Sequence, residues 1–298
     1  MAQPSTLHRS LELAGTLPAL MVAADRVAAT VIQGVHGRRR VGQGDAFWQY
    51  RPYRDGDSAS QIDWRQSARS RHLFVRETEW EAAASVWLWR DASPSMQYAS
   101  LKNIDTKAVR GELITLALAS LLADASERVA VLGTGQRPIT GRVAVRRVAE
   151  TLFDETRDPN HKPASLPPLV PLPPHGTVVL VSDWLDPLDQ VEAAIRHYSS
   201  AGVRGHLVQV LDPAEEDLPF NGHVKFEGLE SEGQHTIRRV ETVRVAYGAR
   251  LAAQKEGLQR LTRSAGWTTH LHRTDRPPQT VLLSLYLAMA DLRRLNAA

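Results

Sequence analysis

The sequence contains no cysteine among its 298 residues. This absence excludes a disulfide framework, a zinc or iron–sulfur site with thiolate ligands, and a cysteine nucleophile. A metal ion would therefore have to be held by histidine or by oxygen ligands. The absence also fits a reducing compartment, and we expect a cytoplasmic protein.

The sequence also lacks a hydrophobic run that is long enough to cross a membrane. The two longest apolar stretches, residues 113–123 and 281–290, reach only about half of the roughly 20 residues that a membrane-spanning helix needs. The N-terminal segment has no Lys/Arg-rich start and no clear small-residue cleavage site. We therefore expect a chain that neither spans a membrane nor carries a secretory signal.

A strong excess of charge of either sign is missing as well. The 36 Lys and Arg residues exceed the 33 Asp and Glu residues by only three, which is a weak field for a chain of this length. We therefore expect no specific nucleic-acid partner. One local exception is the basic patch Arg38–Arg40, through which peripheral contact with an anionic membrane surface, an acidic protein or a nucleic acid stays open.

Regular alternation of strand-like and helix-like segments begins at Glu81. It favours a mainly parallel sheet with helices on both faces, and the continuous apolar run Thr177–Val181 is typical of a strand buried on both sides. We predict an α/β domain with a mainly parallel sheet over residues 81–298, preceded over residues 1–80 by an amphipathic helix and a compact, mostly β or irregular region. Strands are expected at 85–90, 128–132, 137–140, 177–181, 205–211 and 267–272, and helices at 107–123, 142–153, 188–198, 243–261 and 278–295.

Oxygen-bearing side chains directly follow the first of these strands. Asp91, Ser93 and Ser95 stand at alternate positions in Asp-Ala-Ser-Pro-Ser-Met. Ligands of open α/β sheets bind beyond the carboxyl ends of the strands, and carboxylate and hydroxyl groups suit Mg²⁺ or Mn²⁺. This pattern predicts a metal site, and a Ser/Asp turn that caps the next helix is the alternative.

Asp183 and Thr140 extend this candidate site. Asp183 ends the apolar run at 177–181, so it is expected at the same edge of the sheet as Asp91. Thr140 stands between an expected strand and the next helix, where it can supply a hydroxyl or serve as an ordinary helix N-cap. The pair Asp105-Thr106, just before the apolar helix, is a competing source of a further ligand.

Two stretches of the chain carry a family signature. The first contains Gly34-Val35-His36-Gly37, Phe47, Arg51, Tyr53, Gly56-Asp57, Ile62-Asp63-Trp64, Ala68-Arg69 and Glu79-x-Glu81. The second joins Asp91-x-Ser93-x-Ser95-Met96 to Val181-Ser182-Asp183. On these motifs the chain resembles the bacterial "domain of unknown function 58" family, whose C-terminal part is similar to a von Willebrand factor A domain.

The resemblance implies a Rossmann-like, von Willebrand factor A-type sheet with a metal-ion-dependent adhesion site. In such a site Asp91, Ser93, Ser95, Asp183 and Thr140 would hold Mg²⁺ or Mn²⁺, and the ion would bind a carboxylate of a partner protein. Relatives are frequently encoded beside MoxR-type AAA+ ATPases. The implied role is therefore a non-enzymatic adaptor or co-chaperone for such an ATPase or its client.

The chain departs from the family pattern at Thr140 and Trp184, and Arg90 places a charge next to the proposed metal. Thr140 stands in Ile-Thr-Gly where many such sites have Gly-Gly-Thr, and Trp184 follows Asp183 where a glycine is often found. The short antiparallel strand that the resemblance implies is placed at 137–140.

Two other functions stay open from the sequence. The first is binding of nucleic acid or an anionic surface through Arg38–Arg40, although nine arginines oppose seven acids between residues 38 and 81, which favours Arg–carboxylate pairing over phosphate binding. The second is a metal-dependent phosphohydrolase at Asp91. The loop at Asp91 lacks the second Asp of an aspartyl-phosphate phosphatase, and other catalytic motifs are missing, so an enzyme is disfavoured.

Overall fold

The computed structural model describes residues 21–32, 47–53, 62–70, 72–78, 85–157, 164–229 and 233–297. By its contacts the chain divides into two units, residues 38–83 and residues 1–37 together with 84–298. Within the described ranges no helix is both long and apolar enough to cross a membrane.

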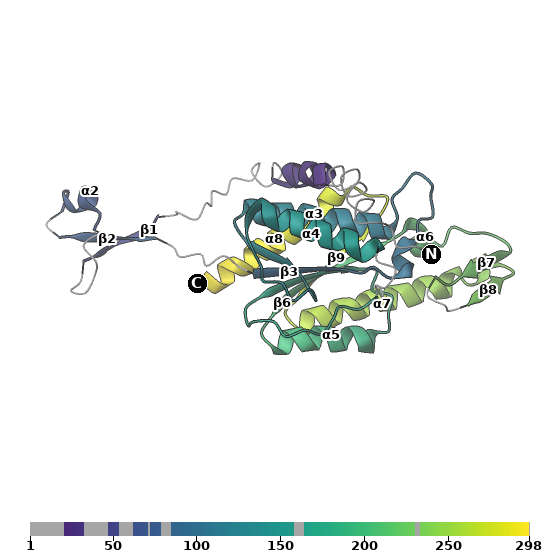
Figure 1. The fold of residues 1–298 in the computed structure, drawn as a ribbon. Coiled ribbons are helices and arrows are strands. Elements are labelled where there is room, and N and C mark those ends of the chain that lie inside the picture. Colours follow the sequence, from purple (N-terminus) through teal and green to yellow (C-terminus); the bar gives the residue numbers. More distant parts are fainter. Residues whose placement is uncertain are drawn as a thin grey trace. The chain divides into compact units, whose positions relative to one another are not determined.

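A sheet of five parallel strands, in the order β4-β3-β5-β6-β9, forms the centre of the larger unit. Its strands are β3 (Ser85–Arg90), β4 (Arg128–Val131), β5 (Thr177–Ser182), β6 (Arg204–Leu211) and β9 (Thr268–Arg273). Figure 1 labels β3, β6 and β9 between the two layers of helices. Every residue of β5 is buried, as its continuous apolar run predicts. The sheet confirms the predicted Rossmann-like α/β fold.

Helices cover both faces of this sheet and create two hydrophobic cores. On one face lie α3 (Lys107–Asp124), α4 (Gly141–Arg157) and α8 (Pro278–Ala297), and on the other lie α5 (Leu188–Ser200) and α7 (Arg244–Ser264) (Figure 1). Alternate strand residues serve the two cores, because successive side chains of a strand point to opposite faces. Val86 and Leu88 of β3 enter the first core, whereas Trp87 and Trp89 enter the second.

The helix over residues 21–32 belongs to the larger unit. Its residues Ala24, Val27, Ala28 and Val31 are buried in the first core. Its Asp25 carboxylate accepts a hydrogen bond from the Ser120 hydroxyl of α3 at 2.6 Å and pairs with Arg142 of α4 at 2.7 Å. Its apolar stripe predicts that the helix docks but not against which surface, so its place in the larger unit could not be read from the sequence.

The described part of the smaller unit contains a two-stranded antiparallel sheet and one short helix. Strand β1 (Phe47–Pro52) pairs with β2 (Phe74–Thr78), and α2 (Trp64–Ser67) lies between them in the sequence. The Asp63 carboxylate caps α2 by accepting a hydrogen bond from the Gln66 N–H at 2.9 Å. These elements match the mostly β character that was expected. The Arg38–Arg40 patch lies outside the described residues.

The strand expected at 137–140 is reduced to a single antiparallel bridge between Val129 and Ile139. The two residues exchange backbone hydrogen bonds of 2.8 and 3.1 Å. Alternate residues of a strand direct their N–H groups to opposite sides, so the N–H that Pro138 lacks would face away from β4, and the bridge at Ile139 tolerates the proline.

The remaining segments complete the connections at the ends of the sheet. Residues 164–176 form no helix or strand, as their proline content predicts, and Leu166, Val170 and Leu172 pack against the second core. Residues 224–227 and 234–237 pair as antiparallel strands. The short elements are the helical turns η2 (Pro94–Gln97) and η3 (Val240–Thr242), α6 (Pro213–Asp217), β7 (Val224–Glu227) and β8 (Gln234–Ile237).

Candidate functional site

Asp91 and Asp183 lie at the carboxyl edge of the sheet, at the ends of the neighbouring strands β3 and β5. From β3 the chain proceeds through α3 to β4, and from β5 it proceeds through α5 on the opposite face to β6. The two connections therefore leave in opposite directions. Open α/β sheets bind their ligands at such a switch point. The Asp91 N–H donates to the Val181 carbonyl at 2.8 Å and ties the two strand ends together.

Four of the five predicted site residues come together in one hydrogen-bonded cluster. The Ser93 and Ser95 hydroxyl oxygens are 3.0 Å apart, and the Ser95 hydroxyl donates to Asp183 Oδ2 at 2.9 Å. Asp91 Oδ1 accepts the Ser93 N–H at 2.7 Å, and its Oδ2 accepts the Ser182 hydroxyl at 2.7 Å. Asp91, Ser93 and Asp183 are buried, and Ser95 is half-buried.

The Ser93 hydroxyl faces Ser95 and does not cap a helix. Ser93 is the N-cap of η2, yet its hydroxyl makes no capping bond and meets Ser95 instead. The cap of α3 is Thr106, whose hydroxyl accepts the Val109 N–H at 3.3 Å. Helix capping therefore does not account for the Ser93 hydroxyl.

Trp184 takes the position where a glycine is often found, with a left-handed φ of 53°. Its indole is fully buried, lies 6.1 Å from the Trp89 ring, and donates from Nε1 to the Val208 carbonyl at 3.1 Å. These contacts hold a backbone conformation that L-residues rarely adopt. The Asp183 carbonyl in turn accepts a hydrogen bond from the buried Gln209 side chain at 2.8 Å.

The other candidate ligands lie apart from the cluster. Thr140 is exposed just before α4, and no described hydrogen bond joins it to the four clustered residues. Asp105 is partly exposed and pairs with Arg110 at 3.1 Å. Thr106 already serves as a helix cap.

Lys107, the first residue of α3, was not among the site residues predicted from the sequence. Its side chain is fully buried, and its Nζ donates to Asp183 Oδ2 at 2.8 Å and to Glu215 Oε1 at 2.5 Å. Glu215 belongs to α6, where its Oε2 accepts the Asp212 N–H at 2.8 Å. The available signal was a lysine within a helix that is otherwise nearly all apolar, because a buried ammonium requires paired carboxylates.

Burial dominates the electrostatics of the cluster. It raises the pKa of Asp91 to about 6, against hydrogen bonds from Ser93 and Ser182 that favour the ionised form. Burial also raises the pKa of Glu215, although Lys107 opposes this shift. Burial lowers the pKa of Lys107, but the charges of Asp183 and Glu215 outweigh it and hold that pKa above its ordinary value.

The arrangement of oxygens fits a hard divalent ion. Ser93 Oγ, Ser95 Oγ and Asp183 Oδ2 follow one another at 3.0 and 2.9 Å. Neighbouring ligands of an octahedral Mg²⁺, with bonds of about 2.0–2.1 Å, are themselves roughly 2.9 Å apart. Among the described residues no three His, Asp or Glu side chains gather as a metal site, so hydroxyl groups and water would have to supply the remaining ligands.

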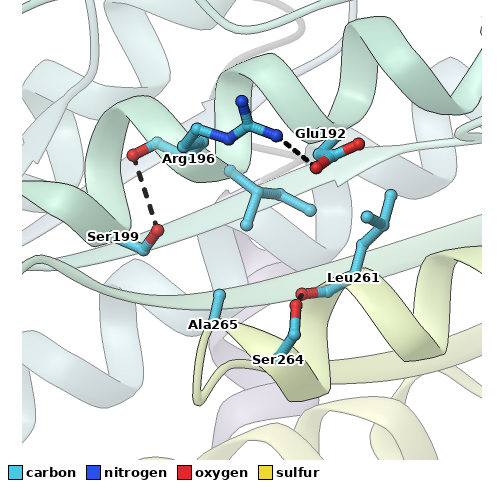
Figure 2. A pocket seen from close by; sticks show the side chains of 7 residues that line it. Glu192, Arg196, Ser199, Leu261, Ser264 and Ala265 are labelled. Carbon is cyan, nitrogen blue, oxygen red and sulfur yellow. Dashed lines mark hydrogen bonds and ion pairs between the residues drawn. The ribbon is translucent and has the colours of Figure 1, made fainter.

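A surface pocket elsewhere in the larger unit is unrelated to this cluster. It lies between α5 and α7, where Glu192 pairs with Arg196 and the Ser199 hydroxyl faces the Arg196 carbonyl (Figure 2). Ser199 and Ala265 stand at the C-terminal ends of their helices, toward the amino edge of the sheet. The predicted site is at the opposite edge.

Comparison with known proteins places the chain in a family. Residues 49–257 match the family described as "Protein of unknown function DUF58". The chain belongs to the DUF58 family. Similar relatives are the uncharacterized proteins Rv1480 of Mycobacterium tuberculosis and Mb1516 of Mycobacterium bovis. Each is 25% identical over 92% of this chain and 89% of the relative.

A solved structure that the search matched is an uncharacterized membrane spanning protein from Vibrio fischeri. It is 12% identical over 70% of this DUF58 chain and 98% of the other, with a TM-score of 0.19, which is too low to indicate a shared fold.

Proposed function

We propose that this DUF58 protein is a non-enzymatic, metal-dependent interaction module that binds a carboxylate of a partner protein at the carboxyl edge of its sheet. One observation carries the proposal. Asp91, Ser93, Ser95 and Asp183 come from stretches about ninety residues apart in the sequence, yet hydrogen bonds join them at the switch point between β3 and β5.

The residues that would hold the ion are Ser93, Ser95 and Asp183. When bound, Mg²⁺ supplies a positive centre whose open positions an acidic side chain of a partner can fill. Asp91 would organise the site, because its two oxygens join the loop after β3 to Ser182 on β5.

The charge of this edge explains why such binding would depend on metal. Asp91, Asp183, Asp212 and Glu215 lie at the ends of β3, β5 and β6, and Lys107 is the cation that contacts two of them. An approaching carboxylate would meet like charge. A divalent ion reverses that interaction.

Exposed leucines supply apolar area beside the polar cluster. Leu185 follows Asp183 by two residues and is 42% exposed. Leu101, which is 50% exposed, lies on the loop after η2, and this loop is anchored by the Ser100 N–H on Asp212 at 2.9 Å. A polar centre with apolar neighbours suits a protein partner.

We further propose that this partner is a MoxR-type AAA+ ATPase or its client, and that the complex forms in the cytoplasm. The support is the family resemblance, since MoxR-type ATPases are frequent genomic neighbours of the family.

The test is binding of the purified chain to a MoxR-type AAA+ ATPase from the same organism, measured with Mg²⁺ and with EDTA. We expect binding only with Mg²⁺, its loss in Asp91→Ala and Ser95→Ala, and full retention in Glu150→Gln, which changes an exposed acid of α4. Binding that survives both EDTA and Asp91→Ala would refute the metal-dependent module.

A further inference from the structure

Lys107 places a positive charge inside the proposed metal site. Its Nζ contacts Asp183 Oδ2 at 2.8 Å, the same oxygen that accepts the Ser95 hydroxyl at 2.9 Å. We infer that the Lys107 ammonium is the resident cation of this cluster and that a divalent ion binds only by displacing it from Asp183. This inference rests on the proposed function for the existence of the metal-bound state.

The ammonium is built into the fold. Lys107 begins α3, Asp183 follows β5 and Glu215 lies in α6, so the two ion pairs connect three separate elements. The lysine side chain is 0% exposed, and its carboxylate partners are 3% and 17% exposed. Because these ion pairs are shielded from water, removing the partner of either charge would destabilise the folded protein.

Lysine and metal compete for one oxygen. Asp183 Oδ1 accepts the Leu185 N–H at 3.2 Å, so Oδ2 is the oxygen that faces the serines. An ion in contact with Ser95 and Asp183 Oδ2 would lie within a few ångströms of Lys107 Nζ. Positive charges at such a distance repel one another strongly when water is excluded.

Glu215 makes the displacement feasible. It already accepts a hydrogen bond from Lys107 at 2.5 Å. After leaving Asp183, the ammonium would keep this carboxylate and would not be left as an unpaired buried charge. The protein therefore folds without the divalent ion, because Lys107 already compensates both carboxylates. Occupancy of the site by metal then depends on the concentration of the divalent ion.

The experiment measures Mn²⁺ binding to the full chain by electron paramagnetic resonance of the free ion. We expect Lys107→Met to bind Mn²⁺ at least ten-fold more tightly than the wild type. Lys102→Met, which removes an exposed lysine from the loop before α3, should bind Mn²⁺ as tightly as the wild type. Adding Asp183→Asn to Lys107→Met should abolish the gain, which would place the bound ion at this cluster.

The possible results separate this inference from the proposed function. Equal Mn²⁺ affinity of the wild type and Lys107→Met would overturn the competition and leave the metal-dependent module standing. No Mn²⁺ binding by either protein would overturn both. If Lys107→Met does not fold, Lys107→Gln gives the same comparison, because its amide removes the charge and keeps hydrogen-bonding capacity.

Discussion

Removing the charge of Lys107 should destabilise the protein strongly. The Lys107→Met substitution preserves much of the side-chain volume but leaves Asp183 and Glu215 without their shared cation. Breaking a buried ion pair by removing one partner costs about 3–5 kcal/mol, because the remaining charge is uncompensated. The raised pKa of Glu215 lets this acid take up a proton at a smaller cost, so we expect a loss near the lower limit, about 3 kcal/mol.

Urea unfolding followed by tryptophan fluorescence measures this loss. Trp184 is buried and directly follows Asp183, so it reports on the cluster as well as on the core. Lys102→Met serves as the control and should change the free energy of unfolding by less than about 0.5 kcal/mol. Combining Lys107→Met with Asp183→Asn and Glu215→Gln should recover part of the loss, because no charge is then left unpaired. A loss below about 1 kcal/mol for Lys107→Met, or no recovery in the triple variant, would refute the reasoning.

Three further predictions concern the core, the pH dependence and the chemistry. Gly205→Ala should lower the free energy of unfolding by about 3 kcal/mol or more, measured by urea unfolding, because the new Cβ would lie 2.1 Å from the Trp267 ring; near-wild-type stability would contradict this packing. Burial lowers the pKa of His272 in the folded protein to about 4, whereas in the unfolded chain this histidine takes up a proton near pH 6.5. The free energy of unfolding should therefore fall by up to about 1.4 kcal/mol per pH unit as the pH drops between these two values. His272→Leu should reduce that slope in unfolding curves collected from pH 7 to 4.5, and an unchanged slope would exclude His272 as its source. Assays with a generic phosphate ester and Mg²⁺ should show no turnover, whereas turnover that Asp91→Asn abolishes would establish a phosphohydrolase.

The sheet and the convergence of Asp91 with Asp183 were predictable from the sequence. The apolar run at 177–181 lies within β5, and parallel neighbouring strands bring the residues that follow them to one edge. The strand expected at 137–140 was wrong beyond the one bridge between Val129 and Ile139.

The pairing of Lys107 with Glu215 was not predictable from local pattern. The two residues are 108 positions apart, and they meet only because the starts of α3 and α6 lie at the same edge of the sheet. A lysine in a buried helix indicates that an acidic side chain lies nearby, but the order of the strands in the sheet determines which acid that is. The docking surface of the helix over residues 21–32 escaped prediction for the same reason.

An anomalous difference map from crystals grown with Mn²⁺ tests the proposed metal site most directly. The account predicts a peak in direct contact with the Ser93 and Ser95 hydroxyls and Asp183, with Lys107 Nζ retained by Glu215 alone. A map without a peak at this position, in which Lys107 still contacts Asp183, would contradict it.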